Sequence, residues 1–263
     1  MSAELLQDLD VPPLLEARHL SRNNGKAGSS RLLVDDVSLQ VASGEVVAVL
    51  GGPGSGKTLL ARLVLGLDVP SAGSVSHDGH DVMQQRGVAW HAFRAAVQGL
   101  FGMEDSALDP RLTVFESISL GLQRRLQLAR GDVSPRVDAA LERVGLLPAA
   151  CRARLPHELT VLQRRLVSLA RSLAGGPALL VADEPLAGLD LSGSAQMLRR
   201  LLEWQRAESG ACLLLTSDIH LVHVAATRVL VLQEGRVVES GPVARVLSAP
   251  RHVATRALIE RGP

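Results

Sequence analysis

Short apolar runs alternate with longer segments of helical spacing along this chain. The runs at residues 45–50, 178–182 and 211–216 are mostly apolar, which is typical of strands buried on both faces of a sheet. Helical spacing covers residues 57–67 after the first run and residues 192–209 between the second and the third. Strands that alternate with helices in this way predict an α/β fold.

The remaining pattern predicts further strands toward both ends of the chain and short helices at its carboxyl end. The predicted strands or hairpins are 14–20, 34–41, 73–82 and 228–240, and the predicted short helices are 243–250 and 252–260. From Phe101 to Leu159 the spacing is mostly helical. We therefore expect one domain over residues 1–263, with a helical subdomain inserted at 101–160.

Composition and charge exclude several classes of function. The net charge is +1, from 28 basic and 27 acidic residues, which argues against a nucleic-acid partner. Cys151 and Cys212 lie far apart and fit a reduced compartment. The acidic amino terminus lacks the apolar core of a signal peptide, and the apolar runs are shorter than the ~20 residues of a spanning helix. If the protein works at a membrane, we expect another chain to hold it there.

A glycine-rich motif follows the first predicted strand and opens the first predicted helix. Its residues are Gly51, Gly52, Pro53, Gly54, Ser55, Gly56, Lys57 and Thr58, which satisfy G-x-x-x-x-G-K-[ST]. Glycines let the backbone wrap a phosphate, Lys57 would reach the β- and γ-phosphates, and Thr58 would ligate Mg²⁺. A chance glycine-rich turn is the plain alternative, but the strand–loop–helix context favours a phosphate site, as does a lysine in a chain whose one other lysine is Lys26.

Two carboxylates end the second apolar run. Asp183 is placed to hold Mg²⁺, and Glu184 to polarise an attacking water as the catalytic residue. The plain alternative is an ordinary acidic turn. Because ligands of open α/β sheets lie beyond the carboxyl ends of the strands, we expect this pair, the glycine-rich motif and Ser217-Asp218 to lie near one another.

Taken together, these residues resemble an ATP-binding subunit of the ABC transporter family, over nearly the whole chain. The segments that carry the resemblance are 34–58, 156–174, 179–190 and 228–242, and segments 93–114 and 252–258 look like the peptide and nickel importer branch. The resemblance implies a P-loop NTPase fold with a RecA-like α/β core, an antiparallel β subdomain and a helical subdomain. It also implies that two such subunits sandwich ATP, each phosphate loop facing the signature turn of the other.

The signature turn departs from the family pattern Leu-Ser-Gly-Gly-Gln. Leu159 is kept, and the turn itself is Thr160, Val161, Leu162 and Gln163. Both glycines, through which backbone amides approach the partner's γ-phosphate, are replaced. Two β-carbons, one of them branched, are expected to block that approach, although the Thr160 hydroxyl could keep some contact.

Three other positions depart from the family as well. The coupling glutamine is replaced by Gly102, and the switch histidine by Ser217, which cannot carry the imidazole's charge. No aromatic residue precedes Trp90 to stack on adenine, so His19 or Arg22 would have to stand in. The D-loop-like residues 187–190 are kept.

Two functions remain open at this point. The first is a transport ATPase subunit that binds Mg²⁺ and ATP and energises import of a small solute, a peptide or a nickel or other metal complex, by closure of the dimer. The second is a non-hydrolysing ATP-binding scaffold or regulatory half of a heterodimeric ABC ATPase. A soluble ABC ATPase of nucleic-acid repair or translation is disfavoured by the near-neutral charge.

The resemblance also implies partners and a location. We expect a second ABC ATPase subunit in a heterodimer, membrane permease subunits and, indirectly, a solute-binding protein, with no nucleic acid. The expected location is peripheral, on the cytoplasmic face of the cell membrane. Two histidine pairs have possible metal spacing but are better interpreted as surface or core residues: His77 with His80, in an exposed turn, and His220 with His223, on a helix.

Overall fold

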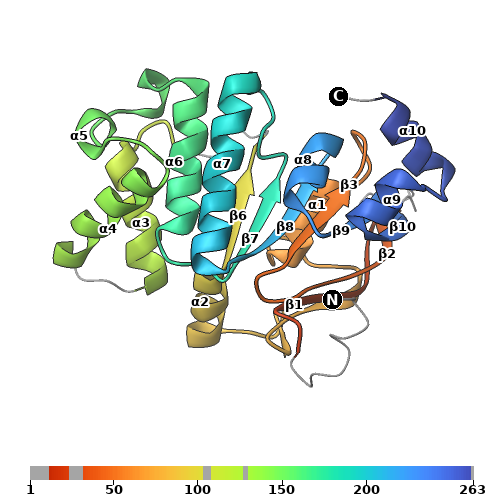
Figure 1. Ribbon diagram of the computed structural model, residues 1–263. Coiled ribbons are helices and arrows are strands. Elements are labelled where there is room, and N and C mark those ends of the chain that lie inside the picture. Colours follow the sequence, from red (N-terminus) through yellow and green to blue (C-terminus); the bar gives the residue numbers. More distant parts are fainter. Residues whose placement is uncertain (1–11, 24–31, 103–107, 127–129, 262–263) are drawn as a thin grey trace.

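Two sheets and the helices around them form the molecule (Figure 1). The computed structural model describes residues 12–23, 32–102, 108–126 and 130–261. The strands are β1 (Leu15–Asn23), β2 (Leu32–Val41), β3 (Val46–Leu50), β4 (Ala72–His77), β5 (His80–Asp81), β6 (Val97–Phe101), β7 (Leu179–Asp183), β8 (Ala211–Thr216), β9 (Arg228–Gln233) and β10 (Arg236–Pro242). Within the described residues, one sheet has the order β10-β9-β3-β8-β7-β6 and the other β2-β1-β4-β5.

Helices cover the larger sheet, and a further group of helices packs together at one side of it (Figure 1). They are α1 (Lys57–Val64), α2 (Gly87–Ala96), α3 (Val114–Leu126), α4 (Arg130–Arg143), α5 (Pro148–Cys151), α6 (Val161–Leu173), α7 (Leu191–Glu208), α8 (Ile219–Ala225), α9 (Val243–Ser248) and α10 (Val253–Arg261). The predicted α/β fold is confirmed.

The central strands are apolar at successive positions because both faces of the sheet are covered. In β8, Leu213 and Leu215 belong to the core shared with α1 and the smaller sheet, whereas Cys212 and Leu214 belong to the core under α6 and α7. Successive side chains of a strand point to opposite faces, so a strand buried on both must be apolar throughout. The unbroken runs in the sequence reflect this two-sided burial.

The register of three parallel strands brings their carboxyl ends to one edge of the sheet. Strand β8 lies between β3 and β7, with Leu50 opposite Thr216 and Asp183 opposite Leu215. The loop after β3, the acidic pair at the end of β7 and the residues after β8 therefore lie together, as predicted.

The structure adds two elements in a stretch where the pattern indicated none. Helix α2 buries Phe93 as its one fully buried side chain, so its apolar stripe is narrow. Strand β6 contains Gln98 and Gly99, which interrupt an apolar run. Its last residue is Phe101, and it pairs in parallel with β7 at the edge of the larger sheet.

Beyond β6, helices α3, α4 and α5 pack together with α6 and share its core (Figure 1). The Val114 and Phe115 amides donate to the Arg154 and Arg152 carbonyls, which ties the start of α3 to the end of this region. Trp204 of α7 is buried in the same core.

The predicted strand pair at the carboxyl end is confirmed, with a two-residue turn at the expected place. Glu234 and Gly235 both have positive φ, of 48° and 82°, as the tight turn between β9 and β10 requires. One histidine expectation was wrong. His80 is exposed, but His77 is buried with its ring 5.6 Å from that of Phe93, and burial lowers the pKa of His77.

The Glu239 carboxylate in β10 fixes the start of the last helix. It accepts hydrogen bonds from the amides of Arg251 and His252, each at 3.0 Å, and from the Thr255 hydroxyl at 2.7 Å. Burial raises the pKa of Glu239, but these hydrogen bonds to the charged form outweigh it and lower the pKa to about 2.

Replacing Glu239 with glutamine should lower the free energy of unfolding by about 1–3 kcal/mol at neutral pH, because it weakens three hydrogen bonds to a buried anion. The carboxylate's folded pKa lies below its ordinary value of 4.5, so its contribution is complete above that pH and declines as the pH falls toward about 2. Denaturant unfolding at a series of pH values measures this.

Glu260→Gln is the matched control, since it removes an exposed charge from the same helix. It should change the free energy of unfolding by less than about 0.5 kcal/mol. A cost of Glu239→Gln that stayed constant down to pH about 2 would contradict the assignment.

Candidate functional site

The glycine-rich loop between β3 and α1 is closely packed against backbone at two of its glycines. A β-carbon on Gly51 would lie 2.6 Å from the Leu232 carbonyl oxygen. Gly56 has φ of 106°, and a β-carbon there would lie 2.6 Å from the Leu33 carbonyl oxygen. Any larger residue at either place would shift the loop. Gly52 is different, because a β-carbon there would meet nothing within 4 Å.

The amino terminus of α1 has the features of an anion-binding site. Gly56 precedes the helix without a side-chain cap, and the first turn contains no acidic residue. The first-turn amides of a helix have no partner within it and carry partial positive charge. Ser55 is 7% exposed, and its buried hydroxyl has no hydrogen-bond partner among the described residues. These features fit a phosphate.

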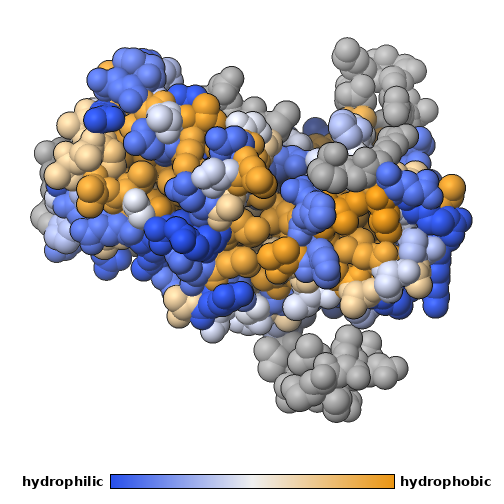
Figure 2. Space-filling view, turned by 45° about the horizontal axis from the view of Figure 1, so that its top comes forward, coloured by the Kyte–Doolittle hydropathy of each residue, from blue (hydrophilic) through white to orange (hydrophobic). Residues whose placement is uncertain are grey.

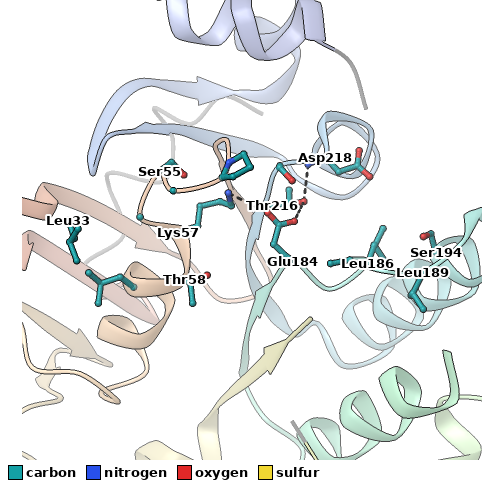
Figure 3. Close-up of a pocket in the computed structure, with 16 residues that line it drawn as sticks. Leu33, Ser55, Lys57, Thr58, Glu184, Leu186, Leu189, Ser194, Thr216 and Asp218 are labelled. Atoms are coloured by element: carbon teal, nitrogen blue, oxygen red, sulfur yellow. Dashed lines mark hydrogen bonds and ion pairs between the residues drawn. The ribbon is translucent and has the colours of Figure 1, made fainter. Parts of the chain in front are cut away.

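The Lys57 ammonium is held at the mouth of the loop (Figure 3). It donates to the Gly51 carbonyl at 2.6 Å and to the Gly52 carbonyl at 3.0 Å, and it lies 3.3 Å from a carboxylate oxygen of Glu184. Its side chain is 7% exposed, so this charge is balanced inside the protein. Lys57, which we expect to reach the phosphates, therefore points toward Glu184 of the acidic pair.

Thr58 and Asp183 meet across 125 positions of sequence. The Thr58 hydroxyl donates a 2.6 Å hydrogen bond to the Asp183 carboxylate, which is 3% exposed. A hydroxyl and a carboxylate are the hard oxygen ligands that Mg²⁺ prefers when phosphate oxygens supply the rest of its shell. The two predicted metal ligands therefore lie together and fit that ion.

Glu184 is held by contacts on both sides of its carboxylate. One oxygen lies 3.3 Å from Lys57, and the other accepts from the Thr216 hydroxyl at 3.3 Å. Thr216 in turn accepts from the Asp218 amide at 3.0 Å. Sequence reasoning missed Thr216, and the available signal was a hydroxyl residue at the carboxyl end of an apolar strand.

Lys57, Thr58, Glu184 and Thr216 line one cavity of about 710 Å³ (Figure 3). Its lining residues come from β2, the glycine-rich loop with the start of α1, the segment between β7 and α7, the start of α7, and the end of β8 with the two residues after it. Ser217, the residue at the switch-histidine position, also lines it and is exposed. A cavity of this size suits a ligand with a few charged groups gathered at one place.

Gly102 leaves no room for a side chain at the position of the coupling glutamine. Its amide donates to the Asp183 carbonyl at 2.8 Å, and a β-carbon would lie 1.7 Å from the Glu184 carbonyl oxygen. Glu184 has φ of 46°, an uncommon conformation for a residue that is not glycine. The close approach of Gly102 to this turn is therefore part of how Glu184 is positioned.

The four predicted signature-turn residues lie at the start of α6, and the first and last of them hydrogen-bond to each other. Thr160 is the N-cap: its hydroxyl accepts from the Gln163 amide at 3.2 Å, and its own amide donates to the Gln163 side chain at 3.0 Å. This is a complete capping box. Val161 is 44% exposed and Leu162 is half-buried. These residues do not line the cavity of their own chain.

The D-loop-like residues 187–190 contact both α6 and α7. Asp190 caps α7 by accepting from the Gly193 amide at 2.7 Å. Arg165 of α6 donates to the carbonyls of Phe101, at 3.4 Å, and Ala187, at 3.3 Å. Arg165 thus links α6 to the end of β6 and to the segment between β7 and α7. Sequence reasoning did not single it out.

Comparison with known proteins agrees with this geometry. The sequence profile described as ABC transporter matches residues 34–187. The chain belongs to the ABC transporter family. A domain of this family binds nucleotide, and the matched segment contains both the glycine-rich loop and the acidic pair.

Two curated relatives come from importers by their names. A nickel import ATP-binding protein of Rhodospirillum rubrum is 39% identical over 94% of this chain and 91% of its own length. A putative peptide import ATP-binding protein of Brucella abortus is 36% identical over 88% of this chain and 69% of its own.

Solved structures confirm the fold. A protein from Clostridium perfringens, part of an ABC transporter complex, matches with a TM-score of 0.77 and 28% identity over 90% of this chain and 92% of that chain. A dimeric ATP-binding cassette bound to ADP and Pi matches with a TM-score of 0.78 at 22% identity, over 87% of this chain and 98% of that chain. Within the described part of our chain, no helix is long and apolar enough to span a bilayer.

The histidine pairs do not form a metal site in the described ranges. No group of three or more histidine, cysteine, aspartate or glutamate residues there could hold a metal ion. His220 and His223 are both exposed on α8.

Gly102→Ala should lower the free energy of unfolding of the nucleotide-free protein by about 1–3 kcal/mol, because the added methyl would overlap the Glu184 carbonyl. Gly52→Ala is the matched control in the same site and should not lower it, since its methyl would enter open space. Denaturant unfolding measures both, and equal costs for the two variants would show that the packing at Gly102 is not tight.

Proposed function

We propose that this chain is the ATP-binding subunit of an ABC importer, and that binding of Mg²⁺ and ATP closes a dimer that energises import of a peptide or of nickel or another metal complex. The observation that carries the proposal is that Lys57, Thr58 and Glu184 line one cavity, with the Asp183 carboxylate hydrogen-bonded to Thr58. The importer branch is supported by the two curated relatives. We further propose that residues 1–263 form one ABC domain, with 101–160 as its helical subdomain.

The residues of the site divide the work by their chemistry. The loop amides at the start of α1 and the Lys57 ammonium would hold the phosphate groups. Thr58 and Asp183 would hold Mg²⁺, which when bound neutralises charge that develops on the transferred phosphoryl group. Glu184, next to Lys57 and Thr216, would accept a proton from the attacking water and orient it.

A second candidate function is a non-hydrolysing ATP-binding half of a heterodimer. Its specific support is that Gly102 lies against the Glu184 turn with no space for the coupling glutamine. Ser217 supplies no imidazole to the cavity, and Val161 and Leu162 place side chains where the family pattern has glycines. In a heterodimer, these differences would affect both ATP sites.

Surface features support the proposed partners. Val161 and Leu191 are 44% and 90% exposed at the starts of α6 and α7, where a second ABC subunit would pack. Figure 2 shows apolar surface gathered in the middle of one face, with hydrophilic side chains around it. Such a surface is typical of a protein contact.

A groove of about 530 Å³ between α2, β6, α3 and α6 would take a segment of the membrane permease. It contains both apolar side chains, such as Trp90 and Leu120, and the cationic groups of Arg94 and Arg171. The chain would then be peripheral on the cytoplasmic face of the membrane, and a solute-binding protein would act indirectly through the permease. A nucleic-acid partner is not part of this proposal.

Glu184→Gln separates the two candidate functions. If this chain hydrolyses ATP, the variant should bind ATP but release phosphate at least about 100-fold more slowly, because the general base is lost. Phosphate release is measured with and without the partner subunit. Unchanged release in the complex would leave only the scaffold function, and absence of ATP binding by the wild-type chain would refute both.

Restoring the family residues should raise turnover of the dimer. The combined variant Val161→Gly, Leu162→Gly and Ser217→His returns the glycines to the signature turn and an imidazole to the cavity. A gain of about tenfold or more corresponds to one recovered transition-state contact. Val161→Ala with Leu162→Ala and Ser217→Ala is the matched control, and equal rates for the two triple variants would show that the replaced residues do not limit turnover.

A further inference from the structure

Thr216 ends β8 with its backbone fixed by neighbouring segments. It lies opposite Leu50 in the parallel pairing of β8 with β3, and its carbonyl accepts a 3.1 Å hydrogen bond from the Gly51 amide. The residue is 1% exposed, yet it lines the cavity. A β-branched side chain has few rotamers. The position of the Thr216 hydroxyl is therefore set by the sheet and by close packing.

The donor chemistry around Thr216 determines the direction of its hydrogen bonds (Figure 3). The Asp218 amide, which can only donate, lies 3.0 Å from the Thr216 hydroxyl oxygen. The single hydroxyl proton is then directed to the Glu184 carboxylate, at 3.3 Å. Asp218 is itself fixed as the N-cap of α8, where its carboxylate accepts from the amides of His220 and Leu221. A chain of hydrogen bonds thus runs from the start of α8 to Glu184.

The two carboxylate oxygens of Glu184 have different surroundings. Oε2 accepts from the Thr216 hydroxyl, whereas Oε1 lies 3.3 Å from the Lys57 ammonium. Under the proposed function, Lys57 contacts the β- and γ-phosphates once nucleotide is bound. The ammonium is then shared with those phosphates, but the Thr216 hydroxyl is not. Of these two side-chain contacts, the one from Thr216 is the contact that holds the carboxylate in both states.

We propose that Thr216 is a positioning residue for Glu184. Its hydroxyl holds Oε2 and leaves Oε1 as the oxygen that accepts the proton of the attacking water. In that step the water oxygen bonds to the γ-phosphorus, the water proton passes to Oε1, and the bond from the γ-phosphorus to the bridging oxygen of ADP breaks. A carboxylate free to rotate would be aimed at the water for less of the time. This inference rests on the proposed hydrolysis of ATP by this chain.

Thr216→Val keeps the shape of the side chain and removes its hydroxyl. The quantity to measure is Glu184-dependent phosphate release, the difference in rate between the complex with wild-type chain and the complex with Glu184→Gln. It should fall by about tenfold, because one hydrogen bond to a charged group is lost. The dissociation constant of ATP with Mg²⁺ should stay within about threefold of wild type, because the hydroxyl contacts Glu184 and not the phosphates. Thr216→Ser keeps a hydroxyl and should retain at least about half of the release.

Thr255→Val is the matched control. Thr255 is fully buried, and its hydroxyl also donates to a glutamate carboxylate, that of Glu239, at 2.7 Å. It does not line the cavity. The variant should lower the free energy of unfolding and leave Glu184-dependent release unchanged. Denaturant unfolding of both valine variants shows whether the effect of Thr216→Val on release exceeds its effect on stability.

Unchanged release by Thr216→Val would overturn the role of Thr216, as would a loss that Thr216→Ser shares or a matching loss in Thr255→Val. If the wild-type chain binds ATP but shows no Glu184-dependent release, the positioning role is overturned and the scaffold function remains. Failure of the wild-type chain to bind ATP would instead refute the proposed function itself.

Discussion

The site depends on the parallel register of three strands, which brings Thr58 within 2.6 Å of Asp183. Asp183 ends β7, Thr58 lies in α1, which follows β3 and the glycine-rich loop, and β8 pairs with both strands, so the two residues meet through two sets of backbone hydrogen bonds and not through local sequence. A slip of one residue in either pairing would turn side chains to the other face of the sheet. Burial of both faces in separate cores prevents such a slip.

The backbone is crowded at the same edge of the sheet, where Gly102 meets the turn that carries Glu184. Gly102 approaches the Glu184 carbonyl closely, and Glu184 adopts a positive φ at that point. A side chain at position 102 would therefore displace the Glu184 turn, because the Glu184 carbonyl occupies the space where a β-carbon would lie.

The start of α6 lies on a surface that we propose faces a second subunit. Thr160 and Gln163 form a capping box there, and Val161 and Leu162 place two β-carbons between them. The cap stabilises the helix end, typically by about 1 kcal/mol.

The sequence by itself determined the strand–loop–helix unit at Gly51–Thr58, the acidic pair after β7 and the hairpin turn at Glu234–Gly235, because each depends on local spacing and on residues with special backbone preferences. The tertiary structure decided the rest. The hydrogen bond between Thr216 and Glu184 and the hydrogen bond from Arg165 to the Ala187 carbonyl join segments that are separate in the chain. Strand β6, interrupted by a glycine and a glutamine, became a strand only through pairing with β7. Contacts of this kind depend on strand order and register, which one sequence read locally does not specify.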